Sequence, residues 1–192
     1  MASSERFTAG HSALLVVDVQ AKLMERVERS ETTLANVVRL VKAAELLGIP
    51  VFATEQYPKG LGPSVPEVAE LIPQRFEKTT FHCCAAGLVL ENLYARGIRK
   101  VTLAGIEAHV CVAQTALELL SMNFRVQVPA DAVSSRHAFD RDVALRRLEQ
   151  TGAVVTTTEA AIFEWTETAD HPQFKAISAL IKEADLARPP AK

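Results

Sequence analysis

Cysteine is scarce in this chain. Only three of the 192 residues are cysteines, and two of them, Cys83 and Cys84, are adjacent. An odd number without regular spacing provides no disulfide framework, which favours free thiols. The sequence therefore predicts a protein of a reducing compartment, the cytoplasm.

Aromatic residues, charged runs and long apolar runs are also few. Aromatic residues make up 6% of the chain and hydrophobic residues 48%, so aliphatic side chains must supply most of the core. The 21 basic residues are scattered among 23 acidic ones, which argues against nucleic acid or an anionic membrane as partner. No apolar run approaches the roughly 18 residues of a membrane span, and no secretory signal pattern is evident.

Short aliphatic runs alternate with segments of helical periodicity. Runs of this kind are typical of parallel strands that are buried on both faces. They lie at residues 13–17, 51–53, 101–104, 126–128 and 154–156, and the helical patterns at 34–47, 85–96, from Cys111 onward, and 140–150. The alternation predicts an α/β fold, a three-layer α/β/α sandwich with a doubly wound, mainly parallel sheet. We expect one domain over residues 1–192, with a C-terminal helix and tail at 170–192.

Residues 55–80 interrupt this alternation. They contain four prolines and two glycines, which predicts an irregular loop, and a loop of this length in a small domain is usually functional.

Three reactive side chains follow predicted strands. Asp18 ends the first strand, Cys111 follows the run at 101–104, and Lys78 closes the long loop. Alone, each has an ordinary structural explanation, as a helix cap, a packed thiol or a solvated lysine. Together they form a plausible catalytic set at the carboxyl edge of the sheet, where open α/β proteins bind ligands. Asp18 can act as general base, Lys78 can stabilise negative charge, and the helix start favours the Cys111 thiolate.

These residues resemble the isochorismatase-like cysteine hydrolases, which include nicotinamidases and carbamoylsarcosine amidases. The matching motifs are LVVDVQ at 15–20, FEKTTF at 76–81 and GIEAHVCV at 105–112, and the likeness runs from about residue 8 to 165. The resemblance implies that Asp18, Lys78 and Cys111 are a catalytic triad. It further implies a cis peptide bond between Ile106 and Glu107, and an oxyanion hole formed by the backbone N–H groups of Glu107 and Cys111.

Other segments resemble one branch of that family, the isochorismatase-domain-containing proteins. These segments are 54–62, 109–112 and 131–136. Where nicotinamidases have metal ligands this chain has Gln56 and Pro58, so neither a metal nor another cofactor is expected. His82, Cys83, Cys84 and His109 offer an alternative metal cluster, but adjacent cysteines lack the spacing of zinc sites, and core packing is the preferred interpretation.

The sequence thus predicts a hydrolase that cleaves a carbon–nitrogen bond of a small amide or carbamoyl compound through a Cys111 thioester. The predicted pocket wall is Gln56, Tyr57, Phe81 and His109. Arg136 and Asp131 are expected to hold a loop or a subunit contact. By resemblance, the chain forms a homo-oligomer, as a dimer, tetramer or larger ring. Two alternatives stay open: a non-catalytic or redox-sensing protein that binds partners, and a vinyl-ether hydrolase of the isochorismate type.

Overall fold

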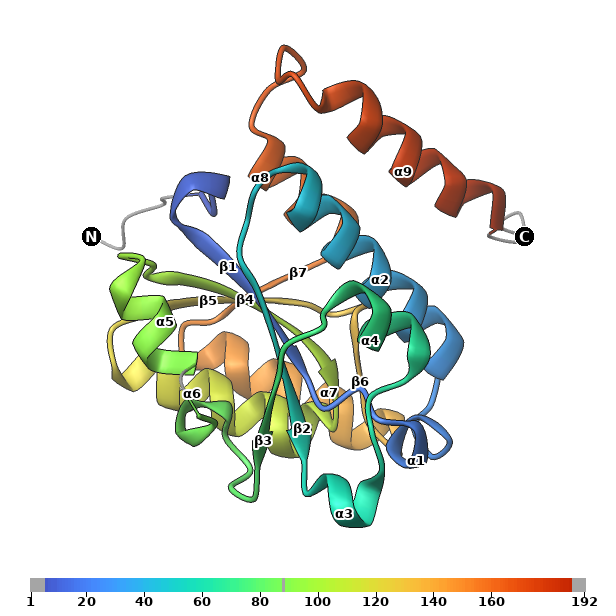
Figure 1. The fold of residues 1–192 in the computed structure, drawn as a ribbon, viewed down its shortest axis with the longest axis vertical. Helices are drawn as coiled ribbons and strands as arrows, with labels where there is room; N and C mark the ends of the chain where they lie inside the picture. Colours follow the sequence, from blue (N-terminus) through green and yellow to red (C-terminus); the bar gives the residue numbers. More distant parts are fainter. Residues whose placement is uncertain (1–5, 88, 188–192) are drawn as a thin grey trace.

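A seven-stranded parallel sheet forms the centre of the fold (Figure 1). The computed structural model describes residues 6–87 and 89–187. The strands are β1 (Ser12–Val17), β2 (Val51–Gln56), β3 (Arg75–Lys78), β4 (Lys100–Ile106), β5 (Arg125–Pro129), β6 (Val133–Ser134) and β7 (Val154–Thr156). Their order is β3-β2-β1-β4-β5-β7, with β6 paired to β4, and these pairings are parallel. The predicted doubly wound α/β fold is confirmed.

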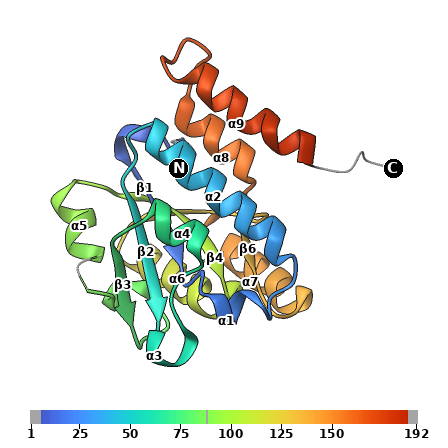
Figure 2. The same ribbon diagram turned by 45° about the vertical axis from the view of Figure 1, so that its right-hand side comes forward.

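Helices cover both faces of this sheet (Figures 1 and 2). One face carries α2 (Ser30–Leu46), α4 (Pro66–Leu71), α8 (Thr158–Thr166) and α9 (Phe174–Ala187). The other carries α5 (Val89–Ala95), α6 (Ala113–Ser121) and α7 (Ala138–Gln150). The short helices α1 (Ala21–Met24) and α3 (Pro58–Leu61) lie beyond the carboxyl ends of the strands. Three further single turns are η1 (Ala9–His11), η2 (Cys83–Ala85) and η3 (Ala108–Val112), the last of which is a π-helical turn.

The core lies on both faces of β1. All six residues of this strand are buried. Leu15 and Val17 pack into the cluster under α5, α6 and α7, whereas Leu14 and Val16 pack into the cluster under α2, α8 and α9. A strand that is buried on both sides cannot alternate apolar and polar residues, which explains its continuous aliphatic run. The buried β1 gives the residue that follows it, Asp18, a fixed position.

The prediction of an irregular loop at residues 55–80 is wrong. β2 extends to Gln56, α3 and α4 follow, and β3 pairs with β2 in parallel. The prolines do not prevent this structure, because Pro58 and Pro66 occupy the first turns of α3 and α4, where a missing N–H costs nothing.

Two other helix predictions need correction at their boundaries. The predicted helix at 85–96 is divided into η2 and α5, with Gly87 at a φ of 45° between them. Cys111 does not open an α-helix, because it lies within the turn η3 before α6 begins at Ala113. The predicted C-terminal helix is present as α9, and residues 188–192 of the predicted tail lie outside the described residues.

Gly105 allows β1 and β4 to approach closely just before the reactive residues. Gly105 pairs with Val17, has a φ of 131°, and a Cβ added to it would lie 2.1 Å from the Val17 carbonyl oxygen. Neither the contact nor the backbone conformation suits a residue with a side chain. Glycine at this position therefore fixes the distance between the segments that carry Asp18 and Cys111.

Replacing Gly105 with alanine is expected to lower the free energy of unfolding by about 1–3 kcal/mol through overpacking, with added backbone strain. Gly48→Ala is the matched control, since Gly48 also has a positive φ, of 68°, but no atom lies within 4 Å of its added Cβ. Urea denaturation of both variants separates crowding from strain. Equal losses of stability would show that the contact with Val17 has no effect.

Within the described residues, no helix combines the length and apolar character needed to cross a membrane.

Candidate active site

Asp18, Lys78 and Cys111 converge at the carboxyl edge of the sheet. Asp18 follows β1, Lys78 is the last residue of β3, and Cys111 lies in η3 after β4. Lys78 Nζ is 2.7 Å from Asp18 Oδ2, and neither side chain is exposed to solvent. The Asp18 carboxylate acts directly on the neighbouring Cys111 thiol and raises its pKa. The three residues that sequence reasoning selected are thus brought into one connected group.

Further hydrogen bonds hold the Lys78 ammonium group in place. It donates to Gln56 Oε1 at 2.6 Å and to the carbonyl oxygens of Thr80 and Phe81 at 3.3 and 3.1 Å. The Gln56 amide is itself oriented, because its Nε2 donates to the Thr79 carbonyl oxygen at 3.0 Å. A buried cation with several acceptors and one carboxylate has little freedom to leave that carboxylate.

The Asp18 carboxylate is supported from its other side by Thr54 and Cys83. Thr54 Oγ1 donates to Asp18 Oδ1 at 2.8 Å, and the Cys83 sulfur lies 3.4 Å from the same hydroxyl. The Thr54 hydroxyl has only one proton, and it donates that proton to Asp18. In its contact with Cys83 the hydroxyl therefore accepts, and the thiol is the donor. Burial, followed by the charge of Asp18, raises the pKa of Cys83 to about 11, consistent with a protonated thiol. Cys83 and Cys84 are both buried in the core, as their packing interpretation predicted.

The turn that carries Cys111 is set by Glu107 and Thr115. Glu107 has a left-handed backbone with a φ of 57°, which redirects the chain from β4 into η3. Thr115 Oγ1 donates to the Cys111 carbonyl oxygen at 2.6 Å and accepts from the Cys83 N–H at 2.9 Å. Thr115 therefore connects the thiol-bearing turn to the segment behind Asp18.

The prediction that the helix start favours the Cys111 thiolate is wrong. Burial raises the pKa of this thiol well above its ordinary value, and the negative charge of Asp18 raises it further, while Lys78 opposes both effects only in part. Desolvation disfavours the charged form of a thiol more than the dipole of one short turn favours it. Cys111 is therefore a protonated thiol beside a carboxylate, and its sulfur could act as a nucleophile only if a base removed the proton.

We expect iodoacetamide to modify Cys111 slowly at neutral pH, with a rate that still rises above about pH 8.5, the pKa of an ordinary thiol. Asp18→Asn removes a negative charge that raises the pKa, so alkylation at a given pH should become faster. Peptide mass spectrometry distinguishes Cys111 from Cys83 and Cys84, the pKa of the latter being raised to about 12 by burial. A wild-type rate that levels off below pH 8.5 contradicts this assignment.

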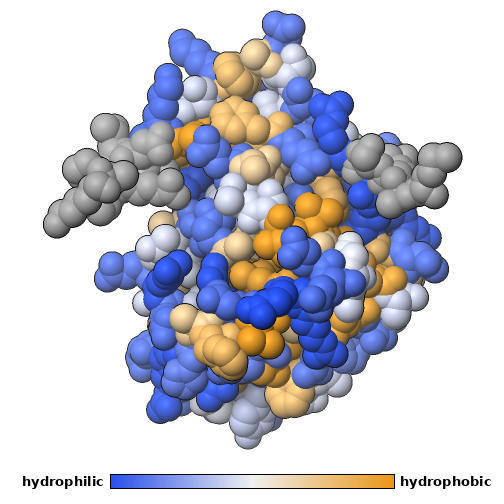
Figure 3. Space-filling model, turned by 180° about the vertical axis from the view of Figure 1, so that it is seen from behind, coloured by the Kyte–Doolittle hydropathy of each residue, from blue (hydrophilic) through white to orange (hydrophobic). Residues whose placement is uncertain are grey.

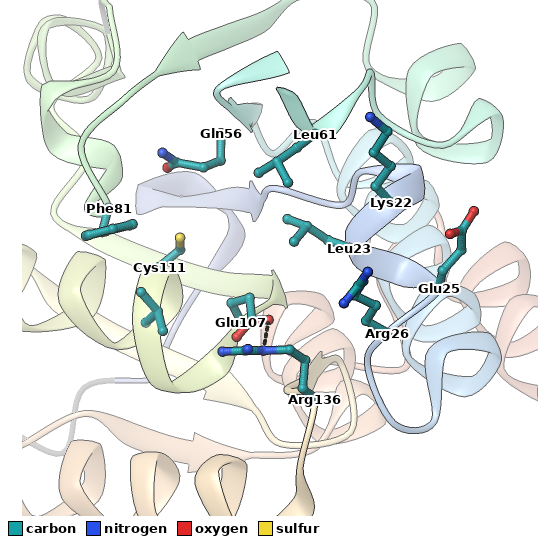
Figure 4. Close-up of a pocket in the computed structure, with 11 residues that line it drawn as sticks. Lys22, Leu23, Glu25, Arg26, Gln56, Leu61, Phe81, Glu107, Cys111 and Arg136 are labelled. Carbon is teal, nitrogen blue, oxygen red and sulfur yellow. Dashed lines mark hydrogen bonds and ion pairs between the residues drawn. The ribbon is translucent and has the colours of Figure 1, made fainter. Parts of the chain in front are cut away.

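A cavity of about 720 Å³ opens next to Cys111 (Figure 4). Its apolar lining residues are Leu23, Leu61, Phe81 and Val110, and the others are Lys22, Glu25, Arg26, Gln56, Glu107, Cys111 and Arg136. Asp18 and Lys78 are buried behind this wall rather than exposed in it. The sulfur is thus the part of this three-residue group that a ligand in the cavity can reach.

Two of the four predicted pocket residues line this cavity and two do not. Gln56 and Phe81 lie on its wall. Tyr57 has a left-handed backbone with a φ of 37° and lines a separate cavity of about 370 Å³. His109 is turned toward Ser135 and Glu107, with its Nδ1 2.9 Å from Ser135 Oγ and 3.3 Å from Glu107 Oε2.

The predicted cis peptide between Ile106 and Glu107 is absent, since the described residues contain no cis bond. The left-handed conformation of Glu107 makes the turn with a trans bond instead. Glu107 and Cys111 both line the cavity. Their assignment as oxyanion-hole residues stays a prediction.

The described residues contain no group of three or more His, Cys, Asp or Glu side chains arranged to hold a metal ion. His82 is partly exposed and Cys83 faces Thr54, so the possible cluster of His82, Cys83, Cys84 and His109 is not assembled.

Sequence reasoning missed several residues that shape the site. Gln20 is fully buried and pairs with the Gln56 backbone, accepting from its N–H at 2.7 Å and donating to its carbonyl oxygen at 3.1 Å. The only indication of this role in the sequence was the position of Gln20, two residues after Asp18.

Arg136, which was expected to hold a loop, donates from Nε to Glu107 Oε1 at 2.9 Å, and it also lines the cavity. Asp131 caps α8 by accepting from the Thr158 N–H and hydroxyl.

Comparisons with known proteins agree with this architecture. A family model, the isochorismatase domain, matches residues 12–160. Isochorismatase domain-containing protein 2 of Bos taurus is 43% identical over 179 residues, 93% of this chain and 86% of the relative. A solved MAR1 ribonuclease structure from Caenorhabditis elegans is similar at a TM-score of 0.88 and 39% identity, covering 98% of this chain and all of that one (100%). YcaC from Pseudomonas aeruginosa, solved with hexane-2,5-diol and covalent acrylamide, is similar at a TM-score of 0.86 and 26% identity, covering 97% and 99%.

The chain therefore belongs to the isochorismatase domain family, as its motifs predicted.

Proposed function

We propose that this protein is a cysteine hydrolase that cleaves the carbon–nitrogen bond of a small amide or carbamoyl compound. The observation that carries the proposal is the group of thiol, carboxylate and ammonium: Cys111 lies within the electrostatic influence of Asp18, which Lys78 holds at 2.7 Å, beside a cavity of about 720 Å³. A nucleophile, a base within hydrogen-bond reach and a third group that orients the base are the usual parts of covalent catalysis.

In the first half of the reaction, the Cys111 sulfur attacks the substrate carbonyl carbon and forms a carbon–sulfur bond. Asp18 accepts the thiol proton in the same step, which the raised pKa of Cys111 makes necessary. The backbone N–H groups of Glu107 and Cys111 stabilise the oxyanion, at about 3 kcal/mol per donor in comparable sites. The carbon–nitrogen bond then breaks, and Asp18 returns the proton to the leaving nitrogen.

In the second half, water hydrolyses the thioester. Asp18 accepts a proton from the attacking water, the carbon–sulfur bond breaks, and the proton passes to the sulfur. The products are ammonia or an amine together with a carboxylic acid from an amide, or a carbamic acid from a carbamoyl compound, and the enzyme is restored. Lys78 compensates the Asp18 charge each time it returns, since both side chains are removed from solvent.

The two alternatives are less well supported. A redox-sensing thiol needs a low pKa, whereas burial and Asp18 raise that of Cys111. A vinyl-ether hydrolase needs no nucleophilic cysteine, which leaves the position of Cys111 beside Asp18 and the cavity without a purpose. Partner binding without catalysis predicts that no substrate is turned over.

A second candidate activity is ribonucleolytic cleavage, because the chain is 39% identical to a protein described as a ribonuclease. The cationic side chains Lys22, Arg26 and Arg136 at the cavity can contact phosphate. Incubation with labelled single-stranded RNA separates the two candidates. Cleavage that Cys111→Ala leaves intact, together with no release of ammonia from amides, would favour the ribonuclease.

The direct test of the proposal is a screen of primary amides and carbamoyl compounds for ammonia release. Activity that depends on Cys111 and Asp18 supports it, and activity that survives the loss of the thiol refutes it.

We further propose a single-domain chain that acts in the cytoplasm as a homo-oligomer on a small-molecule substrate. The three cysteines are free thiols, which suits a reducing compartment. On the face that Figure 3 shows, apolar residues interrupt the hydrophilic surface. Phe139 and Val143 of α7 are exposed apolar residues. Surfaces of this kind favour contact with another subunit, which light scattering can measure.

A further inference from the structure

Cys83 is a buried thiol to which the proposed reaction assigns no role. It lies in η2, has no solvent exposure, and does not line the cavity beside Cys111. Its side chain and its backbone N–H nevertheless each contact the hydroxyl of a buried threonine. These two residues, Thr54 in β2 and Thr115 in α6, lie on different elements of the fold. One residue of η2 is therefore linked to two elements that flank the site.

The side-chain path leads to the base. The Cys83 sulfur lies 3.4 Å from Thr54 Oγ1, and that hydroxyl donates to Asp18 Oδ1 at 2.8 Å. Because the thiol is the donor in the first contact, the single hydroxyl proton of Thr54 stays directed at the carboxylate. The Asp18 backbone N–H also donates to the Thr54 carbonyl oxygen, at 3.2 Å. These two bonds hold a residue whose left-handed backbone, with a φ of 52°, is uncommon outside glycine.

The backbone path leads to the nucleophile. The Cys83 N–H donates to Thr115 Oγ1 at 2.9 Å, and Thr115 Oγ1 donates to the Cys111 carbonyl oxygen at 2.6 Å. Cys111 lies in the π-helical turn η3 and Thr115 in α6, so the second bond ties this turn to the helix that follows it. The residues that supply the base and the nucleophile are thus each two contacts away from Cys83.

We propose that Cys83 is a positioning residue that fixes the base and the nucleophile relative to each other. Thr54 transmits its position to the Asp18 carboxylate, and Thr115 transmits it to the turn that carries Cys111. This inference rests on the proposed hydrolase function and deepens it, because it concerns what keeps the thiol beside its base. A displacement of about 1 Å between reacting groups can lower a rate about a hundredfold. Neither threonine lines the cavity, so the effect falls on kcat rather than on KM.

Threonine allows a crossed test of this role, because valine keeps its shape and serine keeps its hydroxyl. Turnover is measured as ammonia release from butyramide and butylurea, an amide and a carbamoyl compound. We expect Thr54→Val and Thr115→Val each to lower kcat by about tenfold with KM nearly unchanged, as for the loss of one well-made hydrogen bond. Thr54→Ser and Thr115→Ser should keep most of the wild-type kcat.

Thr166→Val is the matched control. Thr166 is buried in α8, and its hydroxyl donates at 2.8 Å to the carbonyl oxygen of Ile162, four residues earlier, in the same way as that of Thr115. It should lower stability in urea as much as Thr115→Val does but leave kcat intact. Cys83→Ala should lower kcat about threefold, since the backbone path remains, whereas Cys84→Ala in the same turn should not. Serine variants no more active than the valine variants, or equal kcat in Cys83→Ala and Cys84→Ala, overturn the proposal.

Alkylation rates test the positioning without a substrate. Asp18→Asn should accelerate the reaction of Cys111 with iodoacetamide to the extent that the carboxylate is held close to the thiol. We expect this acceleration to be at least about twofold smaller in Thr54→Val and Thr115→Val than in the wild type, because residues of one hydrogen-bond network are coupled. It should be unchanged in Thr166→Val.

This cycle distinguishes failure of the positioning role from failure of the proposed function. If no amide or carbamoyl compound is hydrolysed but the acceleration is smaller in Thr54→Val and Thr115→Val, the positioning role stands and the hydrolase proposal fails. If amides are hydrolysed and the acceleration is the same in these variants as in the wild type, the hydrolase stands and the positioning role fails.

Discussion

Replacing Lys78 with methionine is expected to lower the free energy of unfolding by about 3–5 kcal/mol, because it leaves the Asp18 carboxylate buried without its counter-charge. Lys78 and Asp18 have no solvent exposure and are 2.7 Å apart. Methionine preserves most of the volume of the lysine stem, so the loss reports on charge more than on packing. Urea denaturation at neutral pH measures the change, and turnover should be lost in the same variant.

The double variant Asp18→Asn, Lys78→Met separates stability from catalysis. With both charges removed, the penalty for an unpaired buried charge disappears, so the double variant should be more stable than Lys78→Met alone while it remains inactive. Lys182→Met on the exposed side of α9 is the control and should change stability by no more than about 0.5 kcal/mol. A double variant no more stable than Lys78→Met would show that the charges do not compensate each other.

The triad could be selected from the sequence because a parallel sheet places the carboxyl ends of its strands at one edge. Asp18 follows β1, Lys78 ends β3 and Cys111 follows β4, so residues that are distant in the chain become neighbours as soon as the strand pairing is known. The strands could be recognised because burial on both faces leaves continuous aliphatic runs. The fold and the reactive group therefore follow from the same pattern.

The far wall of the cavity could not be selected in this way. α1 is only four residues long, and its direction depends on Gln20, whose partners are backbone groups of Gln56 and Gly62 more than thirty residues away (separations of 36 and 42). No periodicity in the sequence indicates such a contact. Tyr57 was predicted to line the wall, but its left-handed backbone turns it toward another cavity.

The protonation state of Cys111 was predicted wrongly for a related reason. Its place at a helix start is visible in the sequence, and the dipole there favours a thiolate. Its burial and the negative charge of Asp18 follow from the tertiary structure, and they raise the pKa instead. A local electrostatic argument thus failed because the larger influences come from groups that are distant in the chain.

Removing the thiol is expected to have the largest effect on activity. Cys111→Ala should reduce turnover of any amide identified in the screen by at least about a thousandfold, because no other group in the cavity lining can form the covalent intermediate in the same place. Stability should change little, since alanine is only slightly smaller than cysteine and fits the same buried site in the core. Ammonia release and urea denaturation measure the two quantities.

Two further variants determine whether the loss concerns the nucleophile. Cys84→Ala is the control, because Cys84 is a buried thiol of the same core that does not line the cavity and should leave turnover intact. In wild-type protein mixed with substrate and quenched with acid, intact mass spectrometry should detect the acyl group on Cys111. Asp18→Asn should form this adduct far more slowly because acylation, unlike alkylation, also needs a group that returns the thiol proton to the leaving nitrogen. Acylation at normal rates in Asp18→Asn would assign the base to another residue, since the protonated thiol requires that some group accept its proton.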